Sequence, residues 1–160
     1  MTGMAVPETA LRAVIDAVKT ELQESHDDLR AAIAGLPVAG LDWRPAPEAN
    51  SIAALVAHAL DAERFLVRTA LDRTFERDRE AHFRTIGVDA EGLVAIVDEV
   101  AVEIDALLDE VTAADLARLV VRRQTRTGAG WLLHTPVHTR EHVGQAQLTR
   151  DAWLARGAAG

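Results

Sequence analysis

Four stretches of the chain repeat apolar residues at steps of three and four, and this period constrains the fold more than any other feature. They cover roughly residues 7–35, 50–77, 90–110 and 128–155. The period places apolar side chains on one face of an α-helix, so each helix has a face to bury. Four such helices cover one another most simply as a four-helix bundle. We therefore expect an all-α protein with a single domain over residues 1–160.

The connections between these helices carry less regular signals. Asn50 or Ser51 suits the N-cap of the second helix. Three prolines and a glycine in residues 36–47 predict a stiff, extended connection. Apolar residues within 115–127 predict a short extended segment. Pro136 lies inside the fourth helix, where it removes a backbone donor, so we expect a kink or a restart there.

Composition excludes several classes of function. The formal net charge is −8 with histidine neutral, which opposes approach to a phosphate backbone, so we expect no nucleic-acid partner. The chain has no cysteine, which rules out disulfides and thiolate metal ligands. The N-terminal sequence does not resemble a signal peptide, and no apolar stretch reaches the roughly 20 residues of a membrane span. We therefore expect a cytoplasmic protein with no membrane partner.

Histidines form the main candidate for a functional site. His138 and His142 are four residues apart, so a helix would place their Cβ atoms about 5–6 Å apart on one face. This is how a helix presents two imidazoles to one metal. His134 extends the row by one turn, and His58 lies on the flank of the second apolar stripe. If those two helices are neighbours, His58 would complete a three-histidine face; alternatively, the histidines pack without a metal.

Other residues near these histidines have predicted supporting roles. Gln145 follows His142 by about one turn and would either orient a ligand or pack as an amide between helices. Gly144 would permit close helix packing. We expect His26 and His82 on the surface or in connections.

Several arginines are candidates for binding a carboxylate on a substrate. Arg64 follows His58 on the second helix, and Arg126 precedes the fourth helix. Arg68, Arg122 and Arg123 offer the same chemistry. The alternative is that these basic residues are solvated at the surface.

Two groups of residues resemble a known family. Residues 41–45 (LDWRP), 50–52 (NSI) and 55–58 (LVAH) are similar to the start of the second helix in DinB-like proteins. Residues 138–145, with the pattern His-x3-His-x-Gly-Gln, resemble the fourth-helix signature of that family. The order and spacing of the two groups match along nearly the whole chain.

The resemblance implies a four-helix bundle of the DinB/YfiT-like type with up-down-down-up helices. It also implies that His58, His138 and His142 bind one divalent metal ion, and that the chain forms a homodimer. Family members of known activity include thiol-dependent S-transferases and a maleylpyruvate isomerase that uses mycothiol. We therefore expect a small-molecule thiol and an electrophile as partners.

Three histidine ligands leave several chemistries open. Zn²⁺, Ni²⁺, Fe²⁺ and Co²⁺ all accept such a site. A metal-bound thiol would lose its proton near neutral pH, and without cysteine that thiol must come from a cosubstrate. The alternatives are a metal-dependent hydrolase, a non-catalytic metal-binding protein of the stress response, and a bundle whose histidines only pack.

Overall fold

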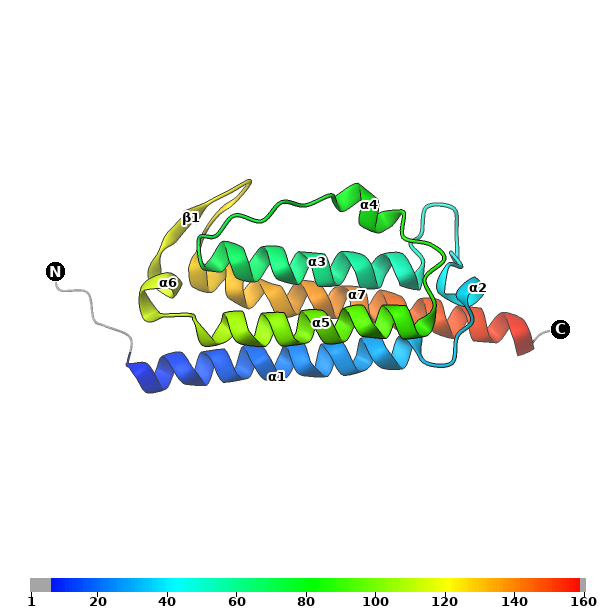
Figure 1. Ribbon diagram of the computed structural model, residues 1–160, viewed down its shortest axis with the longest axis horizontal. Coiled ribbons are helices and arrows are strands. Elements are labelled where there is room, and N and C mark those ends of the chain that lie inside the picture. The colour runs from blue at the N-terminus through cyan, green and yellow to red at the C-terminus, as the bar shows by residue number, and fades with distance from the viewer. Residues whose placement is uncertain (1–6, 159–160) are drawn as a thin grey trace.

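The computed structural model describes residues 7–158, and four long helices dominate it (Figure 1). α1 and α7 run in one direction along the bundle, and α3 and α5 run in the other. This confirms the predicted four-helix bundle and its up-down-down-up arrangement. The long helices are α1 (Glu8–Ile33), α3 (Ile52–Ala70), α5 (Ala90–Asp109) and α7 (Gly128–Ala158).

The core lies along the axis of the bundle. α3 packs against α5 and α7, and α1 packs against the same two helices, so α1 and α3 lie diagonally. Each large apolar side chain buried here contributes about 1.5–3 kcal/mol relative to an exposed one. Within residues 7–158, no helix is long and apolar enough to cross a membrane. The largest fully buried side chains include Ile15, Leu22, Leu29, Leu55, Leu60, Ile104, Leu108 and Leu132.

α3 ends at Ala70, so the helix end predicted near residue 77 was wrong by seven residues. The backbone of Asp72 has φ 56°, in the left-handed region that stops a helix. The Arg73 N–H donates to the Arg68 carbonyl at 2.8 Å, and the Asp72 N–H donates to the Thr69 carbonyl at 2.9 Å. These two bonds form a Schellman motif that satisfies the last carbonyls of the helix.

The connection from α3 to α5 runs the length of the bundle, because the two helices point the same way (Figure 1). It contains α4 (Arg79–Phe83), whose N-cap Asp78 accepts a hydrogen bond from the Ala81 N–H at 3.0 Å. A shorter helix, α2 (Val38–Leu41), lies where the sequence predicted an extended connection. Neither short helix was predicted.

A small hairpin joins α5 to α7. α6 (Ala113–Ala117) leads into β1 (Leu119–Val121), which pairs antiparallel with β2 (Thr125–Thr127). The extended segment predicted within residues 115–127 is therefore one strand of this hairpin. Gly128 follows at once, where an added Cβ would lie 2.1 Å from the Asp115 carbonyl oxygen, so a larger residue would displace α6.

α7 continues through Pro136 as one helix, so the predicted restart was wrong. The Thr135 hydroxyl donates to the Trp131 carbonyl at 3.3 Å and does not cap a new helix. The prediction for Gly144 was also wrong. A Cβ added at Gly144 would meet no atom within 4 Å, so close packing does not require this glycine.

Candidate metal centre

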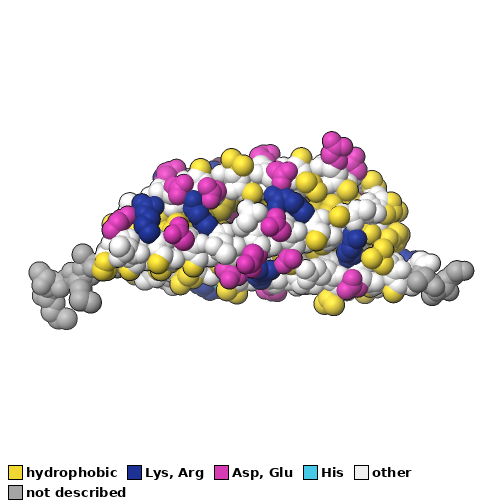
Figure 2. All heavy atoms as spheres, turned by 90° about the horizontal axis from the view of Figure 1, so that it is seen from below, with side chains coloured by type: hydrophobic (Ala, Val, Ile, Leu, Met, Phe, Trp, Pro, Cys, Tyr) yellow, Lys and Arg dark blue, Asp and Glu magenta, His cyan; other side chains and the backbone are white. Residues whose placement is uncertain are grey.

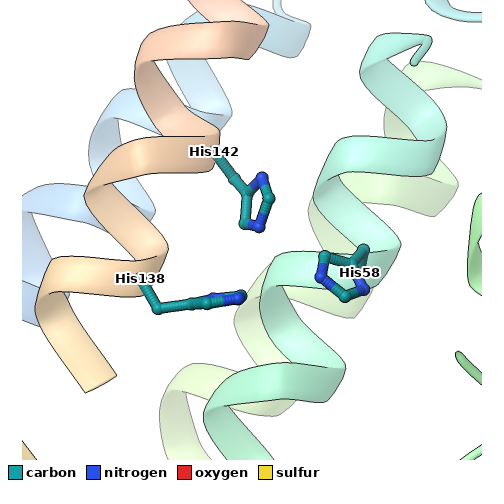
Figure 3. Close-up of side chains that lie close together, drawn as sticks. All are labelled: His58, His138 and His142. Carbon is teal, nitrogen blue, oxygen red and sulfur yellow. The ribbon is translucent and has the colours of Figure 1, made fainter. Parts of the chain in front are cut away.

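Three histidines from α3 and α7 converge between the two helices (Figure 3). Each offers one ring nitrogen, and these three atoms lie within 4.8 Å of one another. The ring centroids of His138 and His142 are 4.6 Å apart, while His58 lies 5.5 Å from His138 and 4.9 Å from His142. The structure thus brings together the three residues that the sequence singled out as a metal-binding face.

Helix geometry explains the convergence. His138 and His142 project from consecutive turns of α7, toward α3. His58 projects back from the second turn of α3, which packs directly against α7. His58 and His142 are buried and His138 is half-buried, so the cluster lies inside the bundle with one side open.

The pattern of hydrogen bonds fits a divalent ion. Nδ1 of both His58 and His138 is buried without a hydrogen-bond partner within residues 7–158, which costs free energy unless another group satisfies it. Nδ1 of His142 pairs with Oε1 of Gln145 at 3.2 Å. A set of three imidazoles with one such supporting contact is typical of sites for Zn²⁺ and similar ions.

The electrostatic surroundings keep two of the imidazoles neutral. Burial, together with the neighbouring His142 and His138, lowers the pKa of His58 to about 3. Burial, together with His142 and His134, lowers the pKa of His138 to about 4. Near neutral pH both rings therefore lack the competing proton and present a lone pair, as a metal ligand must.

α4 covers one side of the cluster. The Phe83 ring stacks on His58 with centroids 4.3 Å apart. Arg77, just before α4, donates to Asp61 on α3, and His82 Nδ1 lies 3.5 Å from the same carboxylate. These contacts fasten the α3–α5 connection beside the histidines and leave the side toward the hairpin open.

That open side is a pocket of about 460 Å³, which falls within the range of small-molecule sites. His58 and His138 lie in its wall, and His134 lies further along the same wall. The ring centroid of His134 is 6.1 Å from that of His138, outside the group of three. Burial lowers the pKa of His134, and Arg126 adds to the effect. His134 therefore faces the pocket, next to the candidate ligands.

The two arginines favoured as substrate ligands lie outside this pocket. Arg64 binds Glu99 and Glu103 on α5, both at 2.7 Å. Arg126 donates to Gln124 at 2.8 Å and lies over the Trp131 ring. Neither arginine is a lining residue in this arrangement, and their role in binding substrate stays a prediction.

Four other arginines line the pocket instead. The sequence had named Arg122 and Arg123 among its candidates, but none of the arginines in the charged stretch after α3, residues 72–80. Arg77 and Arg79 lie in that stretch. Only the path of the α3–α5 connection over the bundle reveals that they reach the histidine cluster.

The prediction that His26 lies at the surface or in a connection was wrong. His26 is 3% exposed, and its Nε2 lies 2.9 Å from Oε2 of Glu63, which is fully buried. The Thr139 hydroxyl donates to the other oxygen of Glu63 at 2.9 Å. This network joins α1, α3 and α7 one residue away from His138. In the sequence, the only sign of this buried network was a polar residue on the apolar face of α1.

Comparison with known proteins agrees with this fold. A structure of a conserved protein from Enterococcus faecalis is 15% identical, with a TM-score of 0.75, and the match covers 88% of this chain and 96% of that one. A DinB-like protein from Bacillus cereus is 15% identical, with a TM-score of 0.66 and coverage of 84% and 89%. A DinB-like protein from Bacillus subtilis is 16% identical, with a TM-score of 0.65 and coverage of 88% and 91%.

Sequence comparison gives the family directly. No curated protein sequence matches the chain. The family profile described as the DinB superfamily matches residues 21–146, a span that runs from within α1 into α7 and includes all three clustered histidines. The chain therefore belongs to the DinB superfamily.

Proposed function

We propose that the protein is a divalent-metal-dependent enzyme that transfers or isomerises small molecules with the help of a low-molecular-weight thiol. The observation that carries the proposal is the cluster of three imidazoles beside an open pocket of about 460 Å³. A divalent ion held there would keep its positive charge and an open coordination position, and would favour the thiolate form of a bound thiol.

The chain's own residues supply binding and positioning. His58, His138 and His142 would hold the ion, and Gln145 would fix the ring of His142 through its Nδ1. Phe65 and Trp131 line the same pocket as His58 and His138, and these apolar rings would exclude water from part of the substrate. The thiol would come from a cosubstrate, because the chain contains no cysteine.

The pocket favours catalysis over simple metal storage, since a storage site needs no space for a second molecule. A hydrolase remains the second candidate for the same open position, with hydroxide in place of thiolate. Incorporation of solvent oxygen into the product would identify hydrolysis, whereas a thioether product would identify thiol transfer.

The first experiment is elemental analysis of protein purified without a histidine tag, followed by thiol-conjugation assays. We expect close to one equivalent of a divalent transition metal, and conjugation of bacillithiol, mycothiol or glutathione to an electrophile. His138→Ala should lose both metal and activity, while His82→Ala should retain the metal, because His82 is not in the cluster. Less than about a tenth of an equivalent, without uptake on titration, would exclude a metal enzyme.

A further inference from the structure

The pocket beside the histidines is lined by cationic groups, although the chain as a whole has a formal charge of −8. The α3–α5 connection contributes Arg77 and Arg79, and the hairpin contributes Arg122 and Arg123. Within the described part of the chain, no aspartate or glutamate is among its lining residues. Two of these charges are paired with carboxylates outside the lining, that of Arg77 with Asp61 and that of Arg122 with Asp72 at 3.0 Å.

The guanidiniums of Arg77, Arg79 and Arg123 have N–H donors without a hydrogen-bond partner in the described part of the chain. Arg77 gives its Nε to Asp61, but its Nη2 is buried and has no hydrogen-bond partner. Arg79 lies over the Phe83 ring and, across residues 7–158, forms no ion pair or hydrogen bond through its side chain. The Arg123 side chain, which is exposed at the pocket rim, likewise forms no ion pair or hydrogen bond within residues 7–158. Donors left free in this way, around one cavity, point to an anionic ligand.

The hollow between α1 and α5 offers a contrast, because its cations are already paired. Lys19 lies 2.8 Å from both Asp105 and Asp109, and Arg30 lies 2.6 Å from Asp98. Figure 2 shows the face seen from the α1 side, where basic and acidic side chains interleave and no histidine is visible. That hollow therefore presents little net charge to a ligand, unlike the pocket beside the histidines.

Apolar groups line the same pocket as these guanidiniums. Phe65 and Trp131 meet edge to face with centroids 6.4 Å apart, and buried Leu66 lies beside them. A ligand in this pocket would therefore meet cationic groups at the rim, an apolar wall, and the imidazoles of His58 and His138. This combination suits a small organic molecule with one charged end.

We propose that the pocket binds the oxyanion group, a carboxylate or a phosphate, of a small organic substrate. Arg79, Arg123 and the free Nη2 of Arg77 hold the oxyanion, since guanidinium forks match both groups in geometry and charge. The apolar part lies against Trp131 and directs the reacting atom toward the histidine cluster. That last point rests on the proposed function, whereas anion binding itself needs no metal.

Isothermal titration of the EDTA-treated full-length protein tests the proposal, with succinate, inorganic phosphate and neutral succinamide as probes at constant ionic strength. We expect succinate or phosphate to bind and succinamide not to bind. The double variant R79Q/R123Q should weaken anion binding by at least about tenfold. Arg12→Gln removes one charge from an exposed ion pair at the start of α1 and should leave affinity unchanged. If succinate binds more tightly than phosphate, the charged group of the ligand is a carboxylate. If phosphate binds more tightly, that group is a phosphoryl group.

Several results would overturn the proposal. The wild-type protein could fail to bind either anion, or the double variant could bind the anion with wild-type affinity. Arg12→Gln could also weaken anion binding as much as the double variant does. His142→Ala separates this proposal from the metal enzyme, because His142 belongs to the histidine cluster but does not line the pocket. The variant should lose the metal yet still bind the anion, so an empty metal site and an empty arginine site are distinguishable outcomes.

Discussion

The clustered histidines differ in how their rings are held. His142 has its Nδ1 paired with Gln145, and Phe83 stacks on His58, whereas the His138 side chain forms no hydrogen bond within residues 7–158. Because an amide oxygen only accepts, the contact places the proton of His142 on Nδ1 and leaves Nε2 with its lone pair. Gln145 therefore selects the tautomer of His142 that a metal requires.

Replacing Gln145 tests this role. Gln145→Ala should weaken zinc binding by about tenfold or more, since loss of a contact that orients a ligand histidine typically costs 10–100-fold. Competition with a chromophoric chelator measures the change. Gln147→Ala is the matched control, because Gln147 is exposed on the same helix and forms no hydrogen bond in the described structure. Equal affinity in the two variants would contradict the role of Gln145.

The helices are held together by polar contacts that a helical period does not reveal. Glu103 on α5 accepts hydrogen bonds from Arg64 at 2.7 Å and from Arg68 at 2.8 Å, both on α3. Burial alone would raise the pKa of Glu103, but the hydrogen bonds and charges of Arg68 and Arg64 lower it below its ordinary value of 4.5. Glu103 therefore stabilises the fold in its charged form.

The pH dependence of Glu103→Gln follows from this direction. A carboxyl whose pKa is lower in the folded state contributes stability above the unfolded value of 4.5, and loses it as pH falls through the lowered folded value. At pH 7 we expect a loss of about 1 kcal/mol in the free energy of unfolding, measured with urea, and this loss should shrink as the pH falls through the lowered pKa of the folded state. Glu99→Gln, at a more exposed partner of Arg64, should cost less than half as much. A difference constant with pH would contradict the charged role.

The buried network around Glu63 acts between three helices. Glu63→Ala would leave His26 and Thr139 without their partner and open a cavity, so we expect about 3 kcal/mol of destabilisation in urea unfolding. Glu63→Gln keeps the shape and one acceptor oxygen, so it should cost clearly less. A Glu63→Ala protein as stable as the wild type would show that the network contributes little.

The sequence predicted long helices well and short ones poorly. α5 has a clean apolar period, and its predicted bounds agree with Ala90–Asp109 within one residue. The end of α3 was missed because Asp72 takes the left-handed position that glycine usually marks. α2 and α4 have four and five residues, too few for a period to show.

The candidate site could be predicted from the sequence only where its residues are close together in the chain. Spacing alone pairs His138 with His142, but His58 joins them only through the packing of α3 on α7. The pocket arginines depend on the path of two connections, which no local pattern encodes. His26 was misplaced because its partner Glu63 is 37 residues away in sequence.

At the scale of the whole molecule, a metal held by α3 and α7 should stabilise the fold. An ion that binds only the folded state adds about 2.7 kcal/mol when its concentration is 100 times Kd. For a protein of this size we expect zinc to raise Tm by about 5–10 °C in calorimetry. His58→Ala should show no such shift, because one helix then loses its only histidine in the cluster. A zinc-induced shift of equal size in that variant would place the ion elsewhere.

The parallel course of α3 and α5 has a consequence for how such proteins diversify. The connection travels the length of the bundle and passes beside the histidine cluster, where Phe83 stacks on His58, and surface connections vary more freely than the helices they join. The histidines lie on rigid helices, whereas all four arginines of the pocket lie in the connections or the hairpin. With the proposed roles, metal binding and ligand choice would be encoded in separate stretches of sequence, so that one could change without the other.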